Sequence, residues 1–260
     1  MPLAEIKSVK QKQPFLVAHR GSSQDAPENT LPAFELAWQQ GADAIEGDFH
    51  LTRDGEIVCV HDEIIRQGIH TQKIVQDSDL DELKLLDVGS RFGKRWKHVR
   101  IPTIAEVFQT IPQGKKIYIE IKCGPLILPK LFEELDKSGL TQGQAIIISF
   151  NAEVIYQMKR HAPDIKAFFL SNFKKDRQTG QFKPTVEEVL KILQRTHADG
   201  FSSKAHKAAD ETFINRILDN GYEYHVWTID KVKTATRFIR MGAMSVTTNV
   251  PGYLRKELHK

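Results

Sequence analysis

The chain has 260 residues, of which 40% are apolar and 27% are charged, and its formal net charge is +4. This composition is typical of a soluble globular protein and excludes disordered and low-complexity chains. The mild charge and the lack of a nucleic-acid-binding motif argue against a nucleic-acid partner. No apolar run approaches the roughly 20 residues of a membrane-spanning helix, so we expect no stable membrane insertion.

Cysteine use and the first residues bear on the compartment. Residues 1–15 lack the continuous apolar core of a secretory signal. Cys59 and Cys123 are the only cysteines, and their spacing fits no metal-binding motif. Buried free thiols are typical of a reducing compartment. We therefore predict a cytoplasmic protein.

Short apolar runs alternate with longer amphipathic segments along the chain. The predicted strands are 15–18, 44–49, 117–121, 145–149, 166–170, 198–202, 223–227 and 244–248. The predicted helices lie near 30–40, 103–111, 126–138, 151–161, 184–196, 207–220 and 231–241. Eight parallel strands separated by helices are typical of a closed TIM (β/α)8 barrel. We predict this α/β fold, as a single domain over residues 1–260.

The alternation of strands and helices is interrupted after the second predicted strand. Residues 57–60 follow Asp54-Gly55, a hairpin signal, so we expect a short antiparallel return along the second strand. From about 62 to 102 no regular pattern holds, which predicts a small insertion above the barrel. The basic cluster 94–100 within it is expected to be a solvated loop.

Charged and aromatic residues recur where the predicted strands end, and TIM barrels carry their active sites at the carboxyl ends of strands. In chain order, these residues are His19, Arg20, Glu46, Asp48, Glu120, Lys122 and Trp227. A charged group beside an apolar strand is unfavourable unless it is paired. Their recurrence at one end of the barrel predicts a functional site.

The residue types indicate the chemistry of this site. Glu46 and Asp48 are two apart in a predicted strand, so both point to one face and can bind one ion. Carboxylate oxygens are typical ligands of Mg²⁺ or Ca²⁺. His19 and His61 can donate and accept protons near neutral pH. We predict acid–base chemistry beside one divalent cation.

The same positions resemble the glycerophosphodiester phosphodiesterase family from about residue 15 to 253. The matching motifs are HRG (19–21), PENT (27–30), GAD (41–43), IE with a following Asp48 (45–48), DG (54–55), HD (61–62), IPT (101–103), EIK (120–122) and WT (227–228). The chain departs from the family pattern at Ile104, often Leu, and at Asn249, often Asp. Neither departure affects the carboxylates or the histidines, but together they leave the preferred headgroup open.

The resemblance implies a barrel enzyme that cleaves a small-molecule glycerophosphodiester to sn-glycerol 3-phosphate and an alcohol, through a cyclic phosphate that water opens. It also implies a role for each residue of the predicted site. Three carboxylates would bind one Mg²⁺ or Ca²⁺, two histidines would form the acid–base pair, and the remaining residues would contact substrate. These groups are respectively Glu46, Asp48 and Glu120; His19 and His61; and Arg20 and Lys122, which would contact the phosphate. Trp227, at the mouth of the barrel, could bind substrate by stacking or could fill space.

Some alternatives stay open at the level of sequence. Apolar residues of the insertion could form the entrance of a lysophospholipase D: Leu83, Leu85, Leu86, Phe92 and Trp96. A catalytically silent phosphate-binding barrel is the other alternative function. Arg20 could orient a carboxylate instead of contacting phosphate, Asn29 could approach the site, and His50 is expected to be exposed. The sequence does not determine the acid and base roles of the histidines or the oligomeric state.

Overall fold

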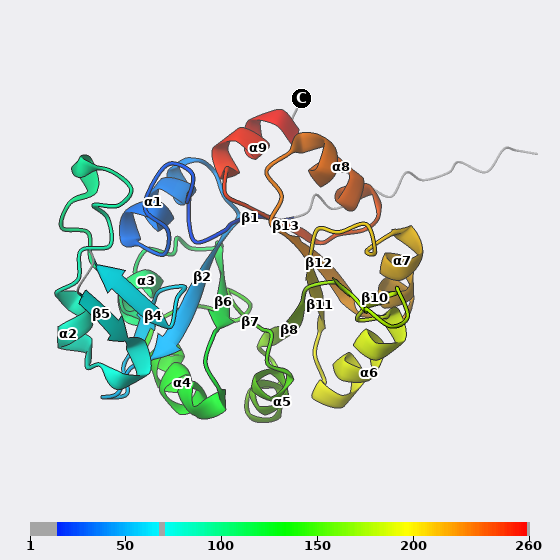
Figure 1. The fold of residues 1–260 in the computed structure, drawn as a ribbon, viewed down its shortest axis with the longest axis horizontal. Coiled ribbons are helices and arrows are strands. Elements are labelled where there is room, and N and C mark those ends of the chain that lie inside the picture. The colour runs from blue at the N-terminus through cyan, green and yellow to red at the C-terminus, as the bar shows by residue number, and fades with distance from the viewer. Residues whose placement is uncertain (1–14, 68–70, 259–260) are drawn as a thin grey trace, which may run out of the picture.

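Eight parallel strands close into a barrel in the computed structural model, which describes residues 15–67 and 71–258 (Figure 1). They are β1 (Phe15–Ala18), β2 (Ala44–Leu51), β6 (Lys116–Ile121), β7 (Ala145–Ser149), β8 (Lys166–Ser171), β11 (Gly200–Lys204), β12 (Glu223–Trp227) and β13 (Ser245–Thr248). β1 pairs in parallel with both β13 and β2, which closes the barrel. The predicted TIM barrel is confirmed.

Helices surround the barrel on its outer side (Figure 1). They are α1 (Leu31–Gln39), α3 (Ile104–Phe108), α4 (Leu128–Lys137), α5 (Ala152–His161), α6 (Val186–Thr196), α7 (Glu211–Asp219), α8 (Val232–Arg240) and α9 (Pro251–Leu258). All but α9 were predicted. α9 buries only Pro251 and Leu254, so its sequence has too little periodicity to identify it as a helix.

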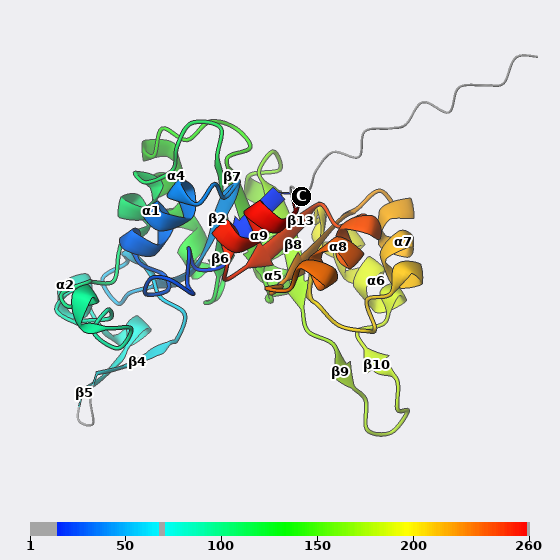
Figure 2. The ribbon, with the colours of Figure 1, turned by 90° about the horizontal axis from the view of Figure 1, so that it is seen from above.

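Two hairpins that the sequence did not predict flank the mouth of the barrel. β3 (Ile57–Cys59) pairs antiparallel with β2 as expected, and is followed by β4 (Ile64–Gln67), β5 (Thr71–Ile74) and α2 (Leu80–Lys84). β9 (Lys174–Lys175) and β10 (Phe182–Lys183) follow β8. Figure 2 shows both hairpins extending from the same side of the barrel. Because each hairpin lies between the carboxyl end of a barrel strand, β2 or β8, and the next helix outside the barrel, this side is the one where active sites lie.

The segment from β3 to Ile101 has a small apolar core of its own. Its buried residues are Val58, Ile65, Val75, Leu83, Leu86 and Ile101. The prediction of one domain over residues 1–260 and the expectation of no secretory signal both involve residues 1–14, which lie outside the described part. Within the described part, no helix combines the length and the apolar character that crossing a membrane requires.

Alternate residues of the barrel strands face the interior. An apolar layer there consists of Val17, Ala44, Tyr118, Ile146, Ile148, Phe168 and Leu170. Because side chains alternate along a strand, Glu46 and Asp48 point to the same side of β2 as Ala44, and Glu120 to the same side of β6 as Tyr118. The acidic residues on β2 therefore lie inside the barrel rather than beyond the strand, because β2 continues to Leu51 alongside β3.

The turn after β1 depends on a left-handed backbone. Arg20 has a φ of 54° and Gly21 a φ of 81°. A Cβ atom at Gly21 would lie 2.6 Å from the backbone carbon of Ala33. Glycine is thus required here both by conformation and by the close approach of α1. Gly55 has a similar φ of 84°, but no atom lies within 4 Å of a Cβ built there.

We expect Gly21→Ala to destabilise the protein more than Gly55→Ala. The substitution at Gly55 should cost about 1–2 kcal/mol, the usual penalty for a left-handed residue with a Cβ atom. The substitution at Gly21 adds a steric clash with Ala33, so its cost should exceed that range. Urea unfolding of both variants measures the difference, and equal losses would contradict a structural role for the contact with α1.

Candidate active site

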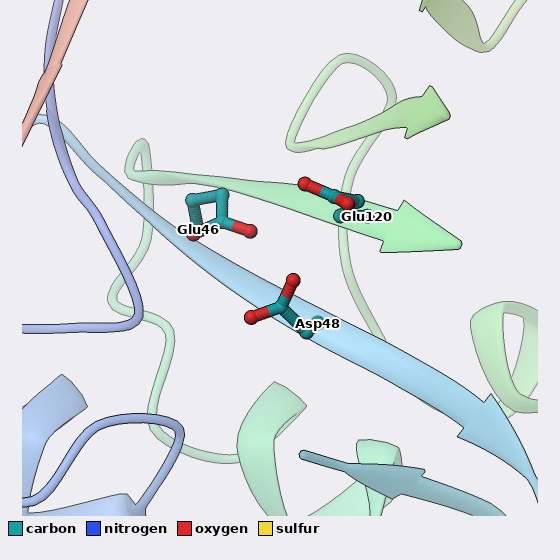
Figure 3. Close-up of side chains that lie close together, drawn as sticks. All are labelled: Glu46, Asp48 and Glu120. Atoms are coloured by element: carbon teal, nitrogen blue, oxygen red, sulfur yellow. The ribbon is translucent and has the colours of Figure 1, made fainter. Parts of the chain in front are cut away.

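Three acidic side chains from neighbouring strands meet inside the barrel. Glu46 and Asp48 come from β2 and Glu120 from β6, where Asp48 and Glu120 are paired in register. Figure 3 shows their carboxylates directed into one space between the two strands. Each offers an oxygen, and these oxygens all lie within 4.8 Å of one another. Glu46 and Asp48 are only 2% and 1% exposed.

Burial and mutual repulsion control the charge of this cluster. Burial, with the charges of Asp48 and Glu120, raises the pKa of Glu46 well above its ordinary value. Burial and Asp48 also raise the pKa of Glu120. Burial alone would raise the pKa of Asp48, but Arg20 and Lys122 lower it below its ordinary value. Two cations therefore partly compensate three carboxylates, and the net charge of the cluster favours a further cation.

Arg20 binds carboxylates at several points. Its backbone N–H donates to Glu46 Oε2 at 2.9 Å, a contact that the left-handed turn makes accessible. Its Nη1 donates to both oxygens of Glu28 at 3.0 Å. Its Nε lies 3.1 Å from Asp48 Oδ2. Arg20 therefore contacts acidic residues at three points, and its predicted contact with the phosphate stays a prediction.

Lys122 lies on the other side of the cluster. Its Nζ donates to Glu120 Oε1 at 2.7 Å and lies 3.3 Å from Asp48 Oδ1. The side chain is 19% exposed, so it is accessible from the mouth of the barrel. Lys122 therefore connects the acidic residues of β2 and β6, and it places positive charge at their edge.

Asn29 has a closer role in the site than its predicted position in the first loop suggested. Its Nδ2 donates to Asp48 Oδ2 at 2.8 Å, and its Oδ1 accepts from the Asp48 backbone N–H at 3.1 Å. Asn29 is 3% exposed and has a left-handed φ of 57°, which asparagine tolerates better than most residues. It fixes the orientation of the Asp48 carboxylate, and the PENT motif was the only sequence signal for it.

The two histidines have different partners. The Nδ1 atom of His19 lies 2.7 Å from Asn249 Oδ1, so the departure from the family pattern at position 249 does contact a histidine, contrary to the expectation from the sequence. Burial and the charge of Arg20 lower the pKa of His19. The Nδ1 atom of His61 lies 2.7 Å from Asp62 Oδ1, and His61 is more accessible, with 35% of its side chain exposed. The imidazole of His19 is thus favoured in its neutral form and faces an amide, whereas His61 faces a carboxylate.

His50 differs from its prediction. It is only 7% exposed, because β2 continues beyond Phe49 and packs against β3. Its Nε2 lies 3.2 Å from the carbonyl oxygen of His61. His50 is absent from the group of potential metal ligands found in the described part of the chain. It therefore supports the segment that carries His61.

Both histidines and most of the predicted site residues line one cavity of about 300 Å³. It includes His19, Arg20, Glu46, His61, Glu120, Lys122 and Trp227. Phe150 and Trp227 form an apolar wall, with ring centroids 5.7 Å apart and an interplanar angle of 83°. A second cavity of about 390 Å³, between the first loop and the insertion, also includes His61. The structure thus places acid–base groups, cations and an apolar surface around one space.

The chemistry of the donor set fits a divalent cation. Among the described residues, the buried Oε1 atom of Glu46 has no hydrogen-bond partner. A buried acceptor without a partner is unfavourable, and a bound cation would satisfy it. The three clustered carboxylates supply hard oxygen ligands of the kind that Mg²⁺ and Ca²⁺ prefer.

Comparison with known proteins identifies the family. The model of the glycerophosphoryl diester phosphodiesterase family matches residues 19–253. A glycerophosphodiester phosphodiesterase of Caldanaerobacter subterraneus is 33% identical over 243 residues, covering 91% of this chain and 94% of that protein. A human lysophospholipase D is 27% identical over 283 residues, covering 96% of this chain and 88% of that protein.

A solved structure extends the similarity to the fold. A phosphodiesterase of Oleispira antarctica, in complex with the product sn-glycerol-3-phosphate, matches with a TM-score of 0.84 and 25% identity. The match covers 95% of this chain and 98% of that one. The chain therefore belongs to the glycerophosphoryl diester phosphodiesterase family and is a phosphodiesterase.

Proposed function

We propose that this enzyme hydrolyses glycerophosphodiesters to sn-glycerol 3-phosphate and an alcohol with the help of one divalent cation and two histidines. The observation that carries the proposal is the meeting of a buried three-carboxylate cluster with His19 and His61 at one cavity. The product bound to the Oleispira antarctica relative supports the choice of substrate.

Glu46, Asp48 and Glu120 would bind the cation, either Mg²⁺ or Ca²⁺. When bound, it supplies a Lewis acid that polarises the phosphate oxygens. Two cationic side chains of the protein act beside it. Lys122, together with the part of the Arg20 guanidinium that Glu28 does not bind, would place positive charge where negative charge develops in the transition state. Trp227 would pack against the glycerol part of the substrate from the apolar wall.

His19 and His61 would transfer the protons. Phosphodiester cleavage requires one group to accept a proton from the attacking hydroxyl and another to protonate the leaving alkoxide. Both imidazoles line the same cavity, and each has its Nδ1 atom engaged by a neighbouring side chain. This arrangement fixes the ring orientations and leaves the second nitrogen of each ring for proton transfer.

A cation in the carboxylate cluster should stabilise the folded protein. After treatment with EDTA and dialysis, adding Mg²⁺ or Ca²⁺ at about a hundred times its Kd should add about 2.7 kcal/mol to the free energy of unfolding, since only the folded state presents the cluster. Calorimetry should therefore show a higher Tm. Glu46→Gln should lose this increase, whereas Glu187→Gln, an exposed carboxamide substitution on α6, should retain it. An unchanged increase in the Glu46 variant would place the cation elsewhere.

Removing either histidine should reduce turnover of glycerophosphocholine. We expect His19→Ala and His61→Ala each to lower kcat by about 10²–10⁴-fold, the usual contribution of a general acid or base. His161→Ala, at the exposed end of α5, is the matched control and should remain near wild-type activity. Release of glycerol 3-phosphate measures all three. Full activity of both site variants, with the fold intact, would exclude acid–base catalysis by this pair.

The alternative substrate class, lysophospholipids, has mixed support. Phe150 is 42% exposed beside Trp227, and this apolar wall could contact an acyl chain. Leu83, however, is buried in the core of the insertion, and Leu86 and Phe92 line the second cavity of about 390 Å³, which shares His61, rather than the cavity that holds the carboxylates. The cavity of about 300 Å³ is also at the lower end of ligand-pocket volumes.

We therefore expect water-soluble glycerophosphodiesters to be the better substrates. In a panel of glycerophosphocholine, glycerophosphoethanolamine, glycerophosphoinositol and their lyso-lipid counterparts below micellar concentration, kcat/KM should be at least about tenfold higher without the acyl chain, a difference of 1.4 kcal/mol in transition-state binding. Higher values for the lyso-lipids would instead identify the enzyme as a lysophospholipase D.

A further inference from the structure

A chain of hydrogen bonds connects His19 to the loop between β12 and α8. Asn249, directly after β13, has its Oδ1 2.7 Å from His19 Nδ1 and its Nδ2 2.8 Å from Asp230 Oδ2. Asp230 Oδ1 also accepts from the Thr248 hydroxyl at 2.9 Å and from the Asn249 backbone N–H at 2.8 Å. Ser23 Oγ donates to the same Asn249 Oδ1 at 3.1 Å.

The directions of these hydrogen bonds determine where the His19 proton lies. An ionised carboxylate only accepts hydrogen bonds, so the amide nitrogen of Asn249 must face Asp230. The amide oxygen then faces His19, and an amide oxygen also only accepts. The contact of 2.7 Å therefore requires a proton on His19 Nδ1. In a neutral imidazole with Nδ1 protonated, Nε2 has the free lone pair.

We propose that Asn249, oriented by Asp230, is a positioning residue that keeps the proton of neutral His19 on Nδ1 and so presents Nε2 as the proton acceptor of the reaction. The consequence for catalysis rests on the proposed function, whereas the position of the proton does not.

This arrangement assigns the two histidine roles that the sequence left open. In the first step, the attacking hydroxyl loses its proton to Nε2 of His19 while its oxygen bonds to phosphorus. The bond from phosphorus to the leaving oxygen breaks, and that oxygen takes a proton from His61. A neutral histidine with a free Nε2 suits the first task. His61 lines the same cavity and has its Nδ1 atom against Asp62, so its Nε2 is left to face the leaving oxygen.

The neutral amide at position 249 also affects the charge of His19. The charged groups that act on this ring are Arg20 in its own turn, Asp48 on β2 and Glu28 in the first loop. The amide accepts a hydrogen bond without adding a negative charge. In the exchanged pair Asn249→Asp/Asp230→Asn, the amide at position 230 would supply the donor, and the carboxylate at position 249 would retain the acceptor for His19. That carboxylate would raise the pKa of His19, so that the base would become protonated at a higher pH.

Nitrogen-15 NMR of the histidine side chains tests the position of the proton without any turnover. Long-range proton–nitrogen correlations distinguish the two neutral tautomers, and comparison with His19→Gln assigns the His19 signals. At a pH where His19 is neutral, we expect Nδ1 protonated and Nε2 unprotonated in the wild type and in the exchanged pair Asn249→Asp/Asp230→Asn. We expect Asn249→Leu to lose this preference, while the signals of His161 stay unchanged. A wild-type His19 protonated on Nε2 would overturn the proposal.

Kinetics then test the consequence for the base. Asn249→Leu should lower kcat by about 10–100-fold, the usual cost of losing the partner that orients a functional histidine, with little change in KM. The exchanged pair Asn249→Asp/Asp230→Asn should retain most of kcat but lose activity at a higher pH on the acidic side of its profile. Wild-type kcat and pH profile in both variants, with unchanged Tm, would contradict a positioning role.

The two proposals can fail separately. If the wild type turns over none of the phosphodiesters while its His19 spectrum shows the Nδ1 tautomer, the proposed function fails and the position of the proton stands. If turnover is normal and the tautomer is the opposite one, the role of Asn249 fails and the phosphodiesterase activity stands.

Discussion

The burial of three carboxylates between two neighbouring strands is the constraint on which the site depends. Parallel pairing puts Asp48 opposite Glu120, and the alternation of side chains puts Glu46 on the same inner face. Like charges this close, and out of water, are unfavourable unless cations and hydrogen-bond donors surround them. Arg20 and Lys122 supply positive charge, and the Arg20 backbone N–H donates to Glu46. The negative charge of the carboxylates that these groups leave uncompensated favours the binding of a cation.

The backbone of the first loop is shaped by the same constraint. Arg20 can reach Glu46 with its N–H and Asp48 with its side chain only because the chain reverses sharply at two left-handed residues. Asn29, also left-handed, then brings its amide against Asp48 from the other end of this loop. Left-handed conformations cost energy in non-glycine residues, and such strain is concentrated at functional sites. Here the hydrogen bonds to buried carboxylates compensate for that strain.

The sequence predicted features that follow a local period, and it missed those that depend on distant contacts. The barrel strands were recognisable as apolar runs between helices, and the spacing of Glu46 and Asp48 correctly put them on one face. The burial of His50 was missed because it depends on how far β2 extends against β3. The contact of His19 with Asn249 joins residues 230 apart in the chain, and no local pattern encodes it. The helix α9 was missed because it buries too few residues to show a period.

The two histidines are anchored to different parts of the fold, so their positions depend on different segments of the chain. The His19 backbone N–H donates to Thr248 at 2.8 Å, and its ring contacts Asn249, so its position depends on the seam where β1 meets β13. The backbone N–H of Val60, the residue before His61, donates to the backbone carbonyl oxygen of Asp48. The carbonyl oxygen of His61 itself contacts Nε2 of His50. Changes in the insertion can therefore move His61 and leave His19 in place.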